Sequence, residues 1–301
     1  MTNEPSFVRH PLGSGTAATL TPTVHGTSIL QTASHLVPLL AQTGHLLLRG
    51  FNPTLDDFND LVRKCSARIT LDPARMFHGD VAQKVDSGHD AIGLHIENGA
   101  TPYPPDMLWF HCITAASQGS QTTVCDGQRV WRGLDAVAQN LFRGRKVIYS
   151  RRVKEKLWRD FTAFSLNDGR EPEEVVPDDL RRLSGSTDTE VIEHSDGSIT
   201  YRHASYAARA TRWSSEIAWA NSIFGPSYNY EAPDIRFADG REIPQEVLDH
   251  VADTAERVTE EIAWQGGDVV LIDNSRVMHG RRAILDPERN IVNAQSFAPT
   301  D

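Results

Sequence analysis

Cysteine is scarce in this sequence, and long hydrophobic runs are absent. The chain of 301 residues holds three cysteines, which lie far apart and form no Cys-x-x-Cys pair: Cys65, Cys112 and Cys125. Neither a disulfide framework nor a cysteine zinc site is expected from them. The apolar runs are far shorter than the roughly 20 residues of a membrane helix, and the opening residues lack the pattern of a signal peptide. The sequence therefore predicts a cytoplasmic protein with no membrane partner.

Positive charge is also in deficit. The chain has 30 lysines and arginines against 40 aspartates and glutamates, which gives a formal net charge of −10. Contacts of basic side chains with phosphates supply most of the affinity for nucleic acids. We therefore expect no nucleic-acid partner, and a small-molecule partner is favoured.

Neither an internal repeat nor a linker rich in Gly, Ser or Pro divides the chain. A length of 301 residues allows two domains, but large barrels of this size commonly fold as one. We therefore expect a single domain over residues 1–301. The polar segment 155–190 is expected to be a mobile excursion that could act as a lid or insert.

The spacing of apolar residues predicts the order of helices and strands. Apolar residues at intervals of three and four positions predict helices at 33–44, 55–69, 130–142 and 244–264. Short apolar runs predict strands at 45–51, 107–113, 122–127, 146–153, 268–280 and 289–298, with a hairpin around residues 195–198. This order is typical of an α+β chain with a barrel or double-sheet jelly roll flanked by helices.

The stretch GLHIENGATPYPPD places His95 and Glu97 two residues apart. On a strand, side chains two positions apart project from the same face, so the imidazole and the carboxylate would converge. The pair alone is also what a hydrogen-bonded surface pair would look like. A metal site needs at least one further ligand.

A second histidine near the end of the chain can supply that ligand. His279 follows the apolar run of DVVLIDNSRVMHGRR. Two histidines and one carboxylate form the facial triad of non-haem Fe(II) oxygenases, which leaves three metal positions open. A zinc hydrolase with the same ligands remains an alternative, although the HExxH helix motif is absent. A non-catalytic jelly roll that binds a small metabolite is a second alternative.

Several motifs together resemble the taurine dioxygenase-like family of Fe(II)- and 2-oxoglutarate-dependent oxygenases. They are TGHLLLRGF, LHIEN followed by PYPPD and LWF, ASQGSQTTVCDG and GDVVLIDNSRVMHGRR, which span nearly the whole chain. The His-x-Glu pair is similar to that of the clavaminate-synthase-like members. The resemblance implies a double-stranded β-helix, with His95, Glu97 and His279 as ligands of Fe(II). It also implies 2-oxoglutarate and dioxygen as cosubstrates.

The same resemblance points to residues that would hold 2-oxoglutarate. Thr122 matches a family threonine with this task, although Gln121 replaces the acid that usually precedes it. Arg289 matches an arginine that binds a carboxylate of 2-oxoglutarate through two parallel hydrogen bonds. Many relatives have a second arginine where this chain has Asn290. A one-residue shift would turn Arg289 away, and Arg281 or Arg282 would then take its place.

The resemblance leaves the substrate open within a class. Hydroxylation of a C–H bond is the default outcome, and desaturation or cyclisation starts in the same way. Members with His-x-Glu often act on amino acids or amino-acid-derived intermediates of secondary metabolism, which is the expectation for this chain. Asn98, Trp109 and His111 are expected to contact the substrate, and Arg281 is a candidate partner for its carboxylate. A substrate tethered to a carrier protein remains open.

Overall fold

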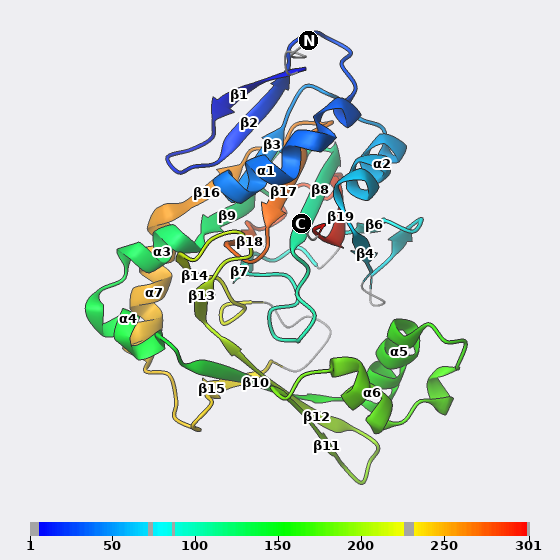
Figure 1. Ribbon diagram of the computed structural model, residues 1–301, viewed down its shortest axis with the longest axis vertical. Coiled ribbons are helices and arrows are strands. Elements are labelled where there is room, and N and C mark those ends of the chain that lie inside the picture. The colour runs from blue at the N-terminus through cyan, green and yellow to red at the C-terminus, as the bar shows by residue number, and fades with distance from the viewer. Residues whose placement is uncertain (1–5, 72–74, 86–87, 226–231, 300–301) are drawn as a thin grey trace.

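Two β-sheets face each other at the centre of the computed structural model, which describes residues 6–71, 75–85, 88–225 and 232–299 (Figure 1). The larger sheet has the strand order β1-β2-β3-β17-β8-β19-β6-β5, with β4 paired to β19. Its strands are β1 (Phe7–Pro11), β2 (Ala18–Pro22), β3 (His45–Leu48), β17 (Val269–Asp273), β8 (Met107–Thr114), β19 (Asn290–Phe297), β6 (Ala82–Lys84), β5 (Phe77–His78) and β4 (Arg68–Thr70).

The smaller sheet closes the other side of the core. Its order is β16-β9-β18-β7, formed by β16 (Thr259–Ile262), β9 (Thr122–Asp126), β18 (Val277–Arg281) and β7 (Ile92–His95). Leu108, Phe110 and Val270 of the larger sheet pack with Val124 and Val277 of the smaller sheet. Two mainly antiparallel sheets that enclose one apolar layer form the double-stranded β-helix that the sequence predicts.

Helices η1 (Ile29–Thr32), α1 (Ala33–Thr43) and α2 (Leu55–Cys65) cover the outer face of the larger sheet (Figure 1). Helix α2 begins at a capping box, in which Thr54 Oγ1 accepts from the Asp57 amide and the Asp57 carboxylate accepts from the Thr54 amide. Its apolar residues Phe58 and Leu61 pack with Trp109 of β8. The outer and inner faces of β8 therefore belong to two different cores.

A second group of helices lies against the smaller sheet. It contains α3 (Gly127–Gly133), α4 (Ala136–Phe142) and α7 (Gln245–Val258), which share an apolar cluster with Met278 of β18. The predicted helix 130–142 is divided at Asp135, whose side chain accepts from the Ala138 amide and begins α4. The predicted helix 244–264 ends at Val258, because residues 259–262 pair with β9 as strand β16.

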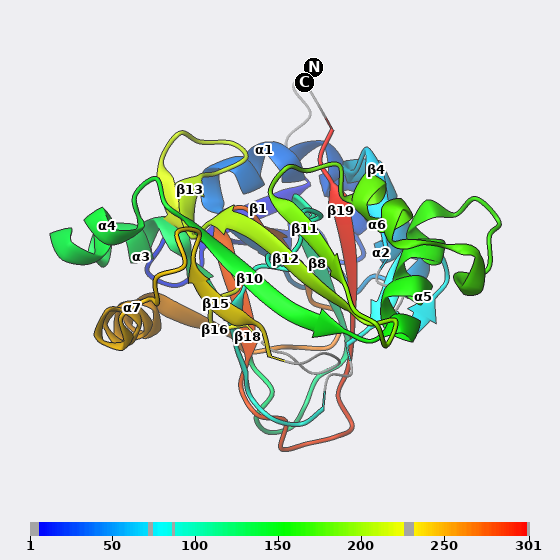
Figure 2. The ribbon, with the colours of Figure 1, turned by 90° about the horizontal axis from the view of Figure 1, so that it is seen from below.

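A third sheet, with the order β11-β12-β10-β15, lies at the bottom of the molecule in Figure 1 and faces the viewer in Figure 2. Its strands are β11 (Thr189–Glu193), β12 (Ile199–Tyr206), β10 (Lys146–Val153) and β15 (Asp234–Phe237), and the short pair β13 (Ala208–Ala210) and β14 (Ile217–Trp219) lies beside it. The hairpin predicted around residues 195–198 joins β11 to β12. This prediction is confirmed.

The segment 155–190, which was expected to be a mobile excursion and a possible lid or insert, is helical for much of its length. It contains α5 (Glu155–Leu166), η2 (Pro172–Glu174) and α6 (Pro177–Ser184). Trp158 and Leu180 pack with Tyr201 of β12 in a small core of their own. The polar composition therefore reflects amphipathic helices that cover the third sheet rather than a loop without secondary structure.

The predicted strand 268–280 is two strands, β17 and β18. Asp273 ends β17, and its Oδ1 accepts from the Ser275 amide at 2.9 Å and from Ser275 Oγ at 2.6 Å. This local turn sends the chain from the larger sheet to the smaller one. All three cysteines are unpaired and buried. Within the described part of the chain, the search for a helix that could cross a membrane found none.

Candidate metal centre

His95 and His279 lie opposite each other on adjacent strands of the smaller sheet. His95 is the last residue of β7 and pairs with His279 at the centre of β18, and their ring centroids are 4.2 Å apart. Glu97 lies in the turn after β7, so the predicted strand does not extend to it. One ligand atom from each of the three side chains lies within 4.8 Å of the others. The structure thus brings together the three residues that the sequence pattern singles out.

The two imidazoles lie beside the groups that a metal site needs. His95 Nδ1 lies 2.8 Å from the carbonyl oxygen of Gly93, which leaves Nε2 directed away from its own strand. Burial, followed by the neighbouring His279, lowers the pKa of His95 to about 3. The ring is therefore neutral near pH 7, as metal binding requires. His279 Nε2 lies 3.6 Å from Glu97 Oε2.

Glu97 is held in its charged form. Burial opposes ionisation, but Arg75 and the neighbouring His279 outweigh it and hold the pKa of the Glu97 carboxyl well below its usual range. Arg75 donates to Glu97 Oε1 at 2.8 Å, and the two side chains are 22% and 8% exposed. Asn274 fixes the backbone of the turn, since its Oδ1 accepts from the Glu97 amide at 2.8 Å and its Nδ2 donates to the Glu97 carbonyl at 3.1 Å.

The donor set fits a divalent transition metal. Two imidazoles and one carboxylate on one side of a site leave the opposite positions open, as in the facial triad of Fe(II) oxygenases. The buried Nδ1 of His279 has no hydrogen-bond partner among the residues that the structure describes. The three ligands already lie close together before a metal binds, and Gly93, Arg75 and Asn274 would orient them.

Thr122 and Arg281 lie side by side further along the smaller sheet. They are direct cross-strand partners on β9 and β18, and both are buried. Thr122 Oγ1 accepts a hydrogen bond from Trp264 Nε1 at 3.0 Å, so its own hydroxyl hydrogen can be donated to another group. Arg281 donates to the carbonyls of Gly88 and Asp90 at 2.9 and 2.8 Å.

Arg289 approaches Arg281 from the larger sheet. It precedes β19, and by strand alternation it lies on the same face as the inward-facing Ile291. Burial, followed by the charge of Arg281, lowers the pKa of Arg289 to about 10. Its buried Nε has no hydrogen-bond partner within the described ranges. Arg282, by contrast, lies at the surface and pairs with Glu256 and Glu261.

The residues expected to contact substrate divide into two groups. Asn98 remains near the triad, where its Nδ2 donates to Gln295 Oε1 at 3.3 Å. Trp109 and His111 face the opposite side of the larger sheet, where Trp109 Nε1 donates to Ser296 Oγ and the His111 ring lies 5.3 Å from that of Phe58. This placement corrects the expectation for both residues.

Phe110 occupies the inward position on β8 that was expected for Trp109 and His111. Its ring lies 5.6 Å from that of His279. All six residues from Met107 to Cys112 are buried, so the sequence shows no alternation between polar and apolar positions that would reveal the inward set. Arg75 and Asn274 were also missed, because each reaches Glu97 from a distant part of the chain.

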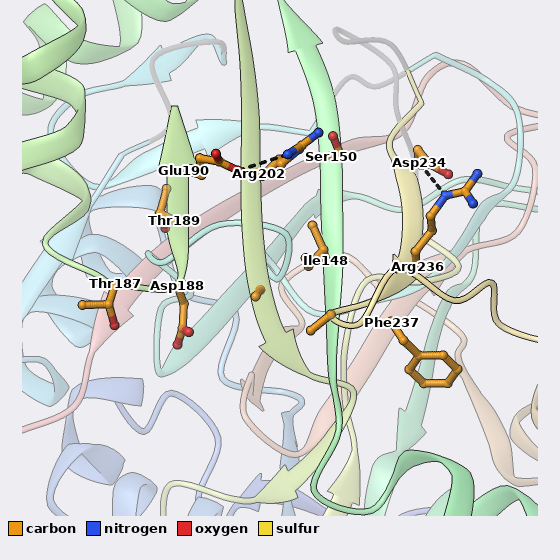
Figure 3. A pocket seen from close by; sticks show the side chains of 13 residues that line it. Ile148, Ser150, Thr187, Asp188, Thr189, Glu190, Arg202, Asp234, Arg236 and Phe237 are labelled. Atoms are coloured by element: carbon orange, nitrogen blue, oxygen red, sulfur yellow. Dashed lines mark hydrogen bonds and ion pairs between the residues drawn. The ribbon is translucent and has the colours of Figure 1, made fainter. Parts of the chain in front are cut away.

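A separate cavity of about 410 Å³ lies on the third sheet (Figure 3). Its lining includes the ion pairs Arg202–Glu190 and Arg236–Asp234, in which each charge is already paired. None of the triad residues lines it. The candidate site is therefore the triad in the double-stranded β-helix and not this cavity.

Known proteins resemble this chain over most of its length. The model of the taurine catabolism dioxygenase TauD, TfdA family matches residues 16–295. The chain is 26% identical to the dapdiamide synthesis protein DdaC of Enterobacter agglomerans, with 94% of this chain and 95% of that protein covered. It is 25% identical to a clavaminate synthase-like protein of Arabidopsis thaliana, with 88% and 86% covered.

Solved structures share the fold at low sequence identity. The PvcB protein of Pseudomonas aeruginosa has a TM-score of 0.66 and 15% identity, with 99% of this chain and 93% of that chain covered. A taurine dioxygenase of Burkholderia xenovorans has a TM-score of 0.62 and 12% identity, with 98% and 90% covered. Because the family model spans nearly all of the chain, the zinc-hydrolase alternative is not favoured. The chain belongs to the TauD/TfdA family and is a non-haem iron, 2-oxoglutarate-dependent dioxygenase.

Proposed function

We propose that this enzyme binds one Fe(II) through His95, Glu97 and His279 and oxidises a C–H bond of an amino acid or an amino-acid-derived biosynthetic intermediate. The observation that carries the proposal is the convergence of three ligand atoms within 4.8 Å of one another. A metal bound there would couple two oxidations by dioxygen, that of 2-oxoglutarate and that of the substrate. One oxygen atom enters 2-oxoglutarate, which yields succinate and carbon dioxide, and the other enters the substrate as a hydroxyl group.

The protein positions the ligands before the metal arrives. The carbonyl of Gly93 orients the ring of His95, and Arg75 holds one carboxylate oxygen of Glu97. The other oxygen, Oε2, is the one nearer to His279. Glu97 would therefore serve through Oε2, which leaves room for other oxygen ligands.

Arg281, Arg289 and Thr122 form the cosubstrate subsite in this proposal. Burial and the charge of Arg281 lower the pKa of Arg289, and a bound dicarboxylate would relieve the repulsion between the two guanidinium groups. Thr122 can donate its hydroxyl hydrogen to a carboxylate oxygen, since its acceptor site is used by Trp264. In this proposal Arg281 binds the carboxylates of 2-oxoglutarate together with Arg289, the arginine expected from the sequence.

The substrate class is supported by the relatives. DdaC is named for dapdiamide synthesis, and PvcB is described as an oxygenase of an isonitrile synthetic pathway. Both names refer to the biosynthesis of small metabolites. The proposal includes free substrates and substrates tethered to a carrier protein.

A succinate assay tests the function directly. The enzyme is purified without oxygen, loaded with Fe(II) and 2-oxoglutarate, and exposed to oxygen with a pool of amino acids and their derivatives. We expect substrate-stimulated succinate formation that the His279→Ala variant lacks. The proposal is wrong if no addition raises succinate above that variant while Zn(II) restores a hydrolytic activity.

A further inference from the structure

A row of carboxamide side chains lies buried on the inner face of β19. Asn293 and Gln295 are 0% and 1% exposed. Asn293 Nδ2, Asn293 Oδ1 and Gln295 Nε2 have no hydrogen-bond partner in the part of the chain that the structure describes. A buried polar group without a partner destabilises the fold, because it has lost its hydrogen bonds to water. Three such atoms on two adjacent inward positions indicate a place where a ligand completes the hydrogen bonds.

The row lies beside the metal centre. Asn293 is directly opposite Phe110 on β8, and the Phe110 ring lies 5.6 Å from that of His279. At the other end, Asn98, which follows Glu97 in the chain, donates to Gln295 Oε1 at 3.3 Å. The row therefore extends from the ring that contacts His279 to the turn that carries Glu97.

The row is distinct from the cosubstrate subsite on the same strand. Inward positions of β19 alternate, and they run from Arg289 through Ile291 to Asn293 and Gln295. The apolar side chain of Ile291 separates the arginine from the carboxamides. The two ends of the strand thus offer a cationic subsite and a neutral hydrogen-bonding subsite.

Asn98 orients the end of the row. Its backbone is left-handed, with a φ of 56°, and its carbonyl accepts from the amide and the hydroxyl of Thr101 at 3.0 and 2.9 Å. The turn is therefore fixed by local hydrogen bonds. Since Asn98 uses the oxygen of Gln295, the amide nitrogen of Gln295 remains for a ligand.

The unpartnered atoms define the chemistry of that ligand. It must accept hydrogen bonds from the two NH₂ groups of Asn293 and Gln295 and donate one to Asn293 Oδ1. A carboxylate only accepts and an ammonium group only donates, and either charge would be buried among neutral groups at a high desolvation cost. An amide or a ureido group both accepts and donates and carries no charge.

We propose that the substrate carries a neutral amide or ureido group, which binds to Asn293 and Gln295 and holds a neighbouring C–H bond at the metal centre. The inference rests on the proposed oxygenase function and specifies its substrate class. Sites built to hydrogen-bond a polar group reject analogues that cannot complete the pairs. Asn293 and Gln295 would therefore determine specificity.

Matched ligand pairs test the inference on the wild-type holoenzyme. The probes are L-glutamine with L-glutamate, L-asparagine with L-aspartate, and Nε-acetyl-L-lysine with L-lysine. Binding to the anaerobic enzyme with Fe(II) and 2-oxoglutarate is measured by calorimetry, and succinate formation is measured after oxygen is admitted. We expect the amide member of at least one pair to bind at least about tenfold more tightly than its partner. Equal or weaker binding of the amide member in all three pairs would overturn the inference.

Variants assign the preference to the row. Asn293→Asp and Gln295→Glu are isosteric and replace donors by acceptors, so each should reduce the amide preference at least about tenfold. Gln295→Met removes the amide without adding a charge, and it replaces Gln295→Glu in the test if the buried carboxylate of that variant prevents folding. Asn140→Asp is the matched control, because Asn140 is exposed on α4. A preference that persists in Asn293→Asp and in the folded Gln295 variants contradicts the assignment.

A separate measurement distinguishes this inference from the proposed function. If 2-oxoglutarate does not bind in an Fe(II)-dependent manner and no addition produces succinate, the oxygenase function itself fails. If 2-oxoglutarate binds and a carboxylate or ammonium probe is the preferred ligand, only the amide inference fails.

Discussion

The two faces of the larger sheet differ in what their buried side chains contact. On the helix-covered face, Trp109 packs with Phe58 and its indole nitrogen is paired with Ser296. On the inner face, Asn293 and Gln295 keep polar atoms for which the described residues provide no partner. The outer face has one such atom on β8, His111 Nδ1. Strands β8 and β19 thus stabilise the fold with one face, and in our proposal they bind the substrate with the other.

Truncation of the outer core should reduce stability without affecting cosubstrate binding. Phe58 is fully buried between α2 and β8, and Phe58→Ala should lower the free energy of unfolding by about 3 to 5 kcal/mol. Urea unfolding measures this loss. The apparent Km for 2-oxoglutarate should stay within about twofold of the wild-type value. A large rise in that Km would show that the two faces are not independent.

Asp273, at the end of β17, should make stability depend on pH. Burial raises the pKa of its carboxyl to about 6, even though Ser275 donates two hydrogen bonds to it. The folded state therefore binds the proton more tightly than the unfolded state. The stabilisation from this proton is present below the unfolded-state pKa and is lost as the pH rises through about 6.

The change should be on the order of 3 kcal/mol in the free energy of unfolding. Asp273→Asn removes the titration while keeping an oxygen that can accept from Ser275. The difference in unfolding free energy between variant and wild type should move in favour of the variant between pH 4 and pH 7. A difference that does not change with pH would contradict the assignment.

On the inner face, loss of a cosubstrate arginine should affect binding more than stability. Arg289→Ala should raise the apparent Km for 2-oxoglutarate by about 100-fold, since removal of a buried charge that pairs with a ligand costs about 2 to 5 kcal/mol. Arg282→Ala is the matched control, because Arg282 pairs with Glu256 and Glu261 at the surface. If Arg289→Ala has no effect and Arg281→Ala has a large one, Arg281 alone binds the carboxylate.

Arg75→Met should weaken metal binding, and this effect should be smaller than that of Arg289→Ala on 2-oxoglutarate binding. It removes the hydrogen bond that orients Glu97, and the loss of such a group typically weakens metal binding by about 10- to 100-fold. Competition with a chelator of known affinity measures the change. Arg63→Met provides the control, because Arg63 is partly exposed and pairs with Asp60 and Asp80 on the surface. Equal metal affinity in the two variants would show that Arg75 does not orient the ligand.

The sequence predicts the triad and the fold class because both leave local signals. His95 and Glu97 stand close together, and His279 follows a strongly apolar strand. The boundary between α7 and β16 has no local sequence signal, since the helical spacing of apolar residues continues past Val258. The helix ends there because the following residues pair with β9. Long-range pairing of this kind depends on which strands meet in space, and one sequence does not show that.

The inward-facing side of β8 was mispredicted for a related reason. Both of its faces are buried, so Trp109 and Phe110 are equally compatible with an inward position. Only the packing of Trp109 on α2 and of Phe110 on His279 assigns the faces. The carboxamides of Asn293 and Gln295 stand out only once their surroundings show that they are buried without partners.

The register of β8 has a consequence for comparing this enzyme with its relatives. Asn290 pairs with Thr114 and Ile291 with Cys112, so Ile113 has no partner of its own across the strands. The irregularity lies on β8, and the alternation of β19 from Arg289 onward is preserved. An insertion on a neighbouring strand can thus be accommodated without reversing the arginine. Equivalent residues in relatives are therefore better matched by the face of β19 on which they lie than by counting residues along β8.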